Sequence, residues 1–260
     1  MKCKDIIEII EKRYPLEAAE SWDNPGLIVG DDEIDVSSIM VALDATDETI
    51  DQAVKAGAQL LITHHPMIFG RINKVNNKTL IGRRILKLIR NDISCYAMHT
   101  NFDVKSMADI NEAQIGLKYT EVLYPTAQND GIAEGIGRVG WLEKPMKYSG
   151  LAEHVKKAMQ TESVRCYGDT DRLIKRVAVS GGSGKSMIQA ALDKHAEVLI
   201  TGDIDYHTGI DACAEGLLII DAGHFGTEHV FKSFMSKWLK EMIPDCDIRE
   251  VCQNEPFFVV

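Results

Sequence analysis

The chain has 260 residues, of which 45% are hydrophobic and 26% are charged, a balance typical of a globular protein with room for one large domain or two smaller ones. Its formal net charge of -10 argues against a surface that neutralises nucleic-acid phosphates, so nucleic acid is a poor candidate partner. None of the six cysteines forms a C-x-x-C pair, which indicates reduced thiols rather than disulfides or a zinc knuckle.

The N-terminal stretch MKCKDIIEIIEKRY places apolar residues at helical spacing between charges, and this pattern predicts a surface helix. It lacks the uninterrupted apolar run of a signal peptide or a membrane span. We therefore expect a cytoplasmic protein with no membrane partner.

Strand-like and helix-like segments alternate through the first half of the chain. The order is SSIMVALDA, DETIDQAVKAG, QLLITHH, TLIGRRILKLIRND and ISCYAMH. Continuous apolar runs separated by amphipathic helices are the pattern of βαβ units, whose parallel strands are buried on both faces. The sequence predicts an α/β fold.

The second half repeats this pattern. Residues 41–65 can be aligned with residues 177–203 with a two-residue insertion, matching V-A at the start and L-I-T at the end. We infer two similar α/β domains related by internal duplication, although the general βαβ pattern could also produce one imperfect repeat. The expected domains are residues 1–120 and 121–260, and it stays open whether the C-terminal helix packs back on the first half.

Four polar clusters follow predicted strands. They are THHP (63–66), HTNFD (99–103), TGDIDYH (201–207) and DAGHFGTE (221–228). Ligands of α/β proteins bind beyond the carboxyl ends of the strands, where the loops converge. We expect these clusters to contribute to one site.

The residue types in these clusters favour a metal site. Imidazole and carboxylate groups together suit Zn, Mn, Fe, Co or Ni. Successive strand side chains point to opposite faces, so His64 and His65 at a strand tip could each bind a different ion of a two-metal centre. His224 and Glu228 are four positions apart, as are His99 and Asp103.

Structural roles for the same residues stay open. Each histidine alone could be a hydrogen-bonded core residue, Asp103 could cap a helix beginning near Ser106 or organise a turn, and Glu228 could favour the N-terminus of its helix. The role of His207 is left undecided. The coincidence of four strand ends is what favours metal binding.

The segment GGSGKS (181–186) is similar to a phosphate-binding P-loop, but the full motif requires glycine at position 179, where the chain has Val179. Anion binding by its backbone N–H groups stays open.

Six motifs follow one another along the chain: SWDNPGLIVG, LITHHPMIFG, HTNFD, VAVSGGSGKS, LITGDIDYH and IIDAGHFGTE. In this order they resemble the GTP cyclohydrolase 1 type 2 homologs, also called NIF-three-like proteins. The resemblance implies two similar α/β domains, a dinuclear metal site in the cleft between them and a ring-shaped homohexamer. It implies the metal ligands His64, His65, Asp103, His224 and Glu228, with Glu228 as the bridge. His99 would orient these ligands from a neighbouring position.

The family name implies a hydrolase in which metal-activated water opens the guanine ring of GTP. No motif in the chain specifies guanine recognition, so other small substrates, phosphate esters or cyclic amides, stay open. The alternative is a metal-binding adaptor or regulatory protein without catalytic activity.

Overall fold

The computed structural model describes residues 1–129, 131–169 and 171–260 and divides the chain into two compact units. The first unit comprises Met1–Phe102 and His229–Asn254, and the second comprises Asp103–Glu228 and Glu255–Val260. The chain thus first leaves the first unit after residue 102, rather than at the expected boundary of residue 120. The C-terminal helix belongs to the first unit, which is the arrangement that the sequence left open.

The first unit contains a five-stranded sheet in the order β1-β4-β3-β2-β11. Its strands are β1 (Gly26–Val29), β2 (Ser38–Ala42), β3 (Leu60–Thr63), β4 (Ser94–Ala97) and β11 (Asp247–Glu250). Strands β2, β3, β4 and β11 pair in parallel, and β1 runs antiparallel to β4. Every residue of β2, β3 and β4 is buried, as expected for parallel strands covered on both faces.

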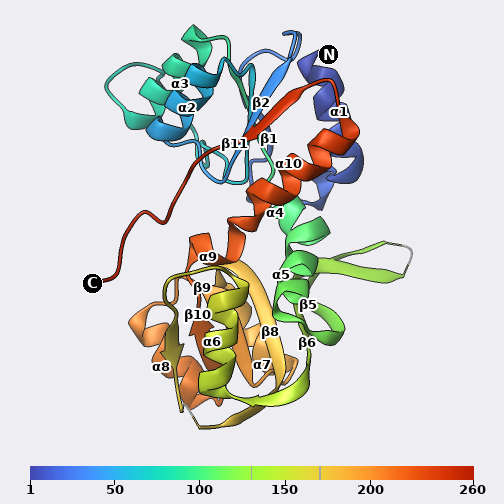
Figure 1. The fold of residues 1–260 in the computed structure, drawn as a ribbon, viewed down its shortest axis with the longest axis vertical. Coiled ribbons are helices and arrows are strands. Elements are labelled where there is room, and N and C mark those ends of the chain that lie inside the picture. Colours follow the sequence, from blue (N-terminus) through green and yellow to red (C-terminus); the bar gives the residue numbers. More distant parts are fainter. Residues whose placement is uncertain (130, 170) are drawn as a thin grey trace. The chain divides into compact units, whose positions relative to one another are not determined.

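Helices cover both faces of this sheet (Figure 1). Helices α2 (Asp47–Ala56) and α3 (Leu80–Arg90) lie on one face, and α1 (Cys3–Arg13) and α10 (Val230–Met242) lie on the other. Short helical turns occupy η1 (Leu16–Ala18) and α4 (Thr100–Phe102). The start of α2 is capped by the Thr46 hydroxyl, which accepts a hydrogen bond from the Thr49 N–H, and α2 ends at Gly57 in the left-handed conformation.

The second unit contains a six-stranded sheet in the order β5-β6-β8-β9-β10-β7. Its strands are β5 (Lys118–Asn129), β6 (Ile132–Lys147), β7 (Arg165–Tyr167), β8 (Leu173–Ser183), β9 (Val198–Gly202) and β10 (Leu218–Asp221). Strands β8, β9 and β10 pair in parallel, whereas β5, β6 and β7 pair antiparallel with their neighbours.

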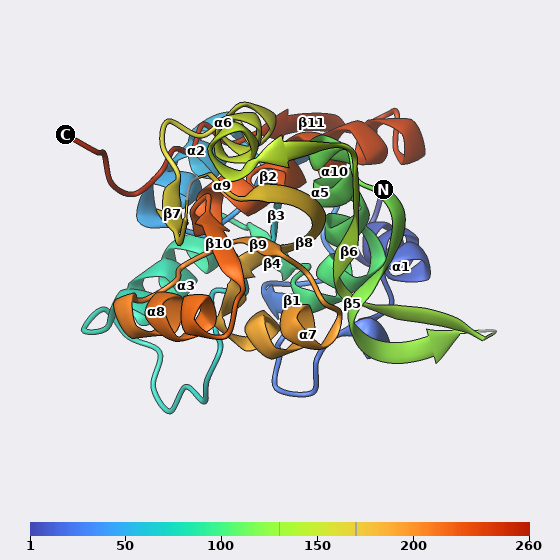
Figure 2. The ribbon, with the colours of Figure 1, turned by 90° about the horizontal axis from the view of Figure 1, so that it is seen from below.

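Side chains alternate between two cores in this unit. Val177 and Val179 of β8 pack with α6 (Tyr148–Ala158), and Ala178 between them packs with α7 (Ile188–Asp193). Figure 2 shows α6 on one face of the sheet and α7 and α8 (Tyr206–Ala214) on the other. The remaining helical segments are η2 (Asp103–Met107, a π turn), α5 (Ala108–Ile115), η3 (Gly184–Met187) and α9 (His224–Glu228).

The two sheets share part of their topology and differ beside the first of their three consecutive strands, where β11 is parallel to β2 but β6 is antiparallel to β8. Each has three consecutive parallel strands joined by helices, β2-β3-β4 and β8-β9-β10, and each carries an antiparallel strand beside the third of them. The predicted repeat falls on matching elements, because residues 41–65 span α2 and β3 and residues 177–203 span α7 and β9. The α/β prediction is confirmed. Shared topology supports duplication, which stays a prediction.

Candidate metal site

The predicted polar clusters lie at the carboxyl ends of parallel strands. His64 and His65 follow β3, His99 follows β4, Asp203 follows β9, and His224 begins α9 after β10. This part of the sequence prediction is confirmed. The reason is topological, because parallel strands present their carboxyl ends at one edge of a sheet.

Three histidines gather in the first unit. The ring centroids of His64 and His65 are 4.9 Å apart, and that of His99 lies 5.3 Å from His64 and 5.6 Å from His65. One nitrogen of each ring lies within 4.8 Å of a nitrogen of the other two. His64 is fully buried, and the other two are partly buried. Three imidazole nitrogens at this spacing can converge on a divalent ion.

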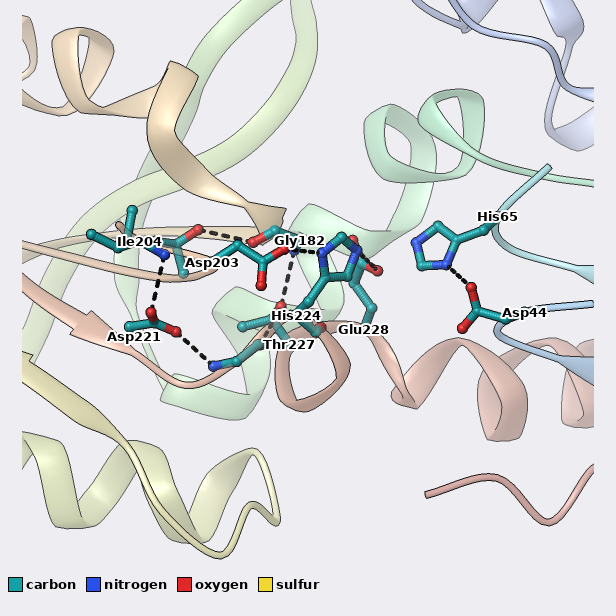
Figure 3. A network of polar contacts seen from close by, with 12 residues as sticks. Asp44, His65, Gly182, Asp203, Ile204, Asp221, His224, Thr227 and Glu228 are labelled. Atoms are coloured by element: carbon teal, nitrogen blue, oxygen red, sulfur yellow. Dashed lines mark hydrogen bonds and ion pairs between the residues drawn. The ribbon is translucent and has the colours of Figure 1, made fainter. Parts of the chain in front are cut away.

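The Nδ1 atom of each of these rings is hydrogen-bonded to an oxygen atom. The partners are the Met98 carbonyl for His64 (2.8 Å), Asp44 for His65 (2.8 Å; Figure 3) and Asp23 for His99 (2.7 Å). Because these oxygens accept hydrogen bonds, Nδ1 is the donor in each ring, and in the corresponding neutral tautomer Nε2 carries the lone pair that can bind a metal. Metal-binding histidines in proteins are held in this way.

Asp23, which orients the His99 ring, is itself held by several hydrogen bonds. Its carboxylate accepts hydrogen bonds from the Thr100 N–H (3.0 Å) and the Thr100 hydroxyl (2.6 Å), in addition to His99. Burial raises the pKa of Asp23, but the hydrogen bonds from His99 and Thr100 outweigh it and hold the pKa at about 2. Asp23 is therefore an anion at neutral pH.

His224 and Glu228 form a second ligand pair, in the second unit. Nδ1 of His224 donates to Asp203 (2.7 Å), and Nε2 lies 3.0 Å from Glu228 Oε2 (Figure 3). Two ligand atoms that each lie about 2.1 Å from one ion are roughly 3.0 Å apart in octahedral and 3.4 Å apart in tetrahedral coordination, so this pair is close enough to share an ion. Glu228 is 3% exposed, and a cation would offset the cost of burying its charge.

The glycines of GGSGKS make room for this pair. A Cβ atom on Gly182, whose φ is +66°, would lie 2.4 Å from Glu228 Oε1 and 3.5 Å from His224 Nε2. The Thr227 hydroxyl accepts a hydrogen bond from the Gly182 N–H (2.9 Å; Figure 3) and so ties α9 to the end of β8. The segment similar to a P-loop therefore has a packing role beside Glu228.

Asp221, the last residue of β10, connects the two loops that carry His224 and its partner. It is 2% exposed and accepts hydrogen bonds from the N–H groups of Ile204 (3.1 Å; Figure 3) and Gly223 (2.9 Å), while Arg165 balances its charge. Each N–H belongs to a residue next to Asp203 or His224. Asp221 thereby fixes the spacing of that pair.

The C-terminal segment adds a further carboxylate to the second unit. Glu255 Oε1 lies 3.3 Å from the position of a Cβ atom on Gly223. Burial and the charges of Asp203, Asp221 and Glu162 raise the pKa of Glu255. Sequence reasoning missed Glu255, because nothing near it in the sequence connects it with the strand ends.

Two of the remaining predicted residues are placed as follows. Asp103 begins the π turn η2, directly after α4, so of the structural roles left open for it, capping a helix that starts near Ser106 is excluded. Single π turns within helical segments occur frequently at functional sites. His207 is exposed on α8, where it contacts the ring of Tyr206.

Comparisons with known proteins agree on one family. The family model Duf34/NIF3 (NGG1p interacting factor 3) matches residues 1–256. A Clostridium acetobutylicum protein named GTP cyclohydrolase 1 type 2 homolog is 40% identical over 243 residues, covering 92% of this chain and 90% of the relative. A Clostridium perfringens protein of the same name is 37% identical over 256 residues, covering 98% and 97%.

A solved structure gives the same result. The crystal structure of a Bacillus cereus protein related to NIF3 matches with a TM-score of 0.94 and 27% identity, covering 100% of this chain and 99% of that one.

Within the described part of the chain, no helix is both long and apolar enough to cross a bilayer.

Proposed function

Because the chain belongs to the Duf34/NIF3 family, we propose that it is a metal-dependent hydrolase whose two divalent ions are bound by His64, His65, Asp103, His224 and Glu228. One observation carries the proposal. Each of the four histidines at the strand ends, including His99, holds Nδ1 in a hydrogen bond to an oxygen atom, so Nε2 is the nitrogen through which each ring would bind a metal, and Nε2 of His224 lies 3.0 Å from its proposed fellow ligand Glu228.

The path of the chain supports ligands from both units. Asp103 directly follows the last residue of the first segment of unit one, and Glu228 directly precedes the point where the chain returns to that unit. The chain therefore crosses between units at two proposed ligands. Glu228 offers two carboxylate oxygens, and a carboxylate that binds two ions can bridge them.

Some of these residues are proposed to bind the ions, and others to orient the binding residues. His64, His65 and His224 would bind ions through Nε2, while Asp44 and Asp203 hold two of these rings through Nδ1. His99 is proposed to orient the ligands, with Asp23 as its fixed anion. Bound Zn, Mn, Fe, Co or Ni would lower the pKa of a coordinated water, and so would supply a nucleophile at neutral pH.

The substrate is proposed to be a small molecule. The names of the relatives favour ring opening of a purine nucleotide of the GTP cyclohydrolase type. We further propose that the protein acts in the cytoplasm as a homohexamer, since its family likeness implies this assembly.

The test combines metal analysis with turnover. Metal-loaded protein is incubated with GTP and related nucleotides, the products are separated by chromatography, and bound metal is counted by plasma mass spectrometry. The proposal predicts bound metal and a ring-opened product. Bound metal without product from any nucleotide or physiological metal would favour a non-catalytic metal-binding or adaptor role. Absence of bound metal would refute the ligand assignment.

A further inference from the structure

Asn111 on α5 is a buried polar side chain that the proposed metal chemistry does not use. It is fully buried, and neither its amide nitrogen nor its amide oxygen has a hydrogen-bond partner within the described part of the chain. Buried amides in native proteins are nearly always paired, because leaving them unpaired lowers stability. A group kept at such a cost requires an explanation.

The location of Asn111 supplies one. A Cβ atom on Gly181 would lie 3.3 Å from Asn111 Nδ2 and 3.3 Å from Glu228 Cγ. The neighbouring Gly182 is packed in the same way against the Glu228 carboxylate and His224 Nε2. Asn111 and the proposed ligand Glu228 therefore both pack against Gly181, and all these residues belong to the second unit.

The chemistry of an amide restricts what can pair with it. Nδ2 only donates and Oδ1 only accepts, so a partner must offer an acceptor beside a donor. A fully ionised phosphate ester offers only acceptors and would leave Oδ1 unpaired, whereas a metal ion would pair with Oδ1 and leave Nδ2 unpaired. A lactam, a urea or a purine edge with ring N–H beside C=O pairs with both.

We propose that Asn111 is a substrate-binding residue that hydrogen-bonds a cyclic amide edge of the molecule bound beside Glu228. The proposal rests on the proposed function and selects, among its open substrate classes, cyclic amides over phosphate esters. Since the amide is buried, a ligand that pairs with it is shielded from water. In such a shielded site each hydrogen bond discriminates most strongly between ligands that can form it and ligands that cannot.

The test measures ligand binding, metal content and stability in the same samples. Hydantoin, uracil, guanosine and inorganic phosphate are titrated calorimetrically into the metal-loaded wild-type protein and the Asn111→Leu variant. We expect at least one cyclic amide to bind, and to bind about 10- to 100-fold more weakly to the variant, at unchanged metal content. The variant without metal should melt about 2–4 °C higher, since it buries no unpaired amide.

Two further variants keep the test decisive. Asn111→Ala should lose binding in the same way if leucine is too large to fold. Ser38→Ala is the control. It removes a buried hydroxyl that also lacks a partner in the described chain, but Ser38 is the first residue of β2 in the first unit, so its loss should leave ligand binding unchanged. Equal binding by wild type and Asn111 variants, loss of metal in them, or no binding of any cyclic amide would overturn the proposal. Absence of metal from wild type would instead refute the proposed function.

Discussion

Gly182→Ala tests whether the glycine-rich turn exists to accommodate Glu228. The added Cβ would lie 2.4 Å from Glu228 Oε1, whereas ordinary contacts begin at 3.4 Å. The carboxylate must therefore retreat by about 1 Å, a shift large enough to disturb metal coordination, in which distances vary by only about 0.2 Å. The left-handed φ of +66° adds about 1–2 kcal/mol of backbone strain.

The expected result is a loss of zinc affinity of about 10- to 100-fold, measured by competition with a fluorescent chelator. Gly57→Ala is the matched control, because Gly57 has a φ of +64° and no atom within 4 Å of its added Cβ. Both variants should lose similar stability on chemical denaturation, but only Gly182→Ala should lose affinity. Equal zinc affinities in the two variants would refute the packing argument.

Three further predictions concern the ligands, their support and the cysteines. His65→Ala and Glu228→Ala should each lose bound metal while keeping the far-ultraviolet circular dichroism of the wild type; retention of stoichiometric metal after dialysis would show that the assignment is wrong. Asp221→Asn should cost about 1–3 kcal/mol of unfolding free energy in urea and weaken zinc binding, since one oxygen that accepts from the Ile204 or Gly223 N–H is replaced by a donor. Burial raises the pKa of Cys3 to about 11 and that of Cys95 to about 12, so both should resist iodoacetamide at pH 8 in the folded protein while exposed Cys252 reacts; peptide mass spectrometry showing equal labelling would contradict this.

The strands and the candidate ligands were predictable because their signals are local. Parallel strands covered on both faces need continuous apolar runs, and ligand-type residues directly follow β3, β4 and β10 in the sequence. The cap at Thr46 and the glycine at Gly57 likewise mark the ends of α2 within a few residues.

The unit boundaries and the supporting residues were not predictable in this way. Strand β11 pairs with β2 across most of the chain length, and no local pattern announces that pairing. Asp23 and Asp44 are ordinary acidic residues in the sequence, and only tertiary structure brings them to His99 and His65. The same holds for Asn111, whose unpaired amide becomes visible only once its surroundings are known.

The central claim is that two ions are bound by histidines and carboxylates from the four strand-end clusters. The most direct test is an anomalous-diffraction crystal structure of metal-loaded protein. The account predicts two ions per chain, about 3.5–4 Å apart, with His64, His65, Asp103, His224 and Glu228 as ligands and Glu228 between the ions. A single ion, or two ions bound by other residues, would contradict it.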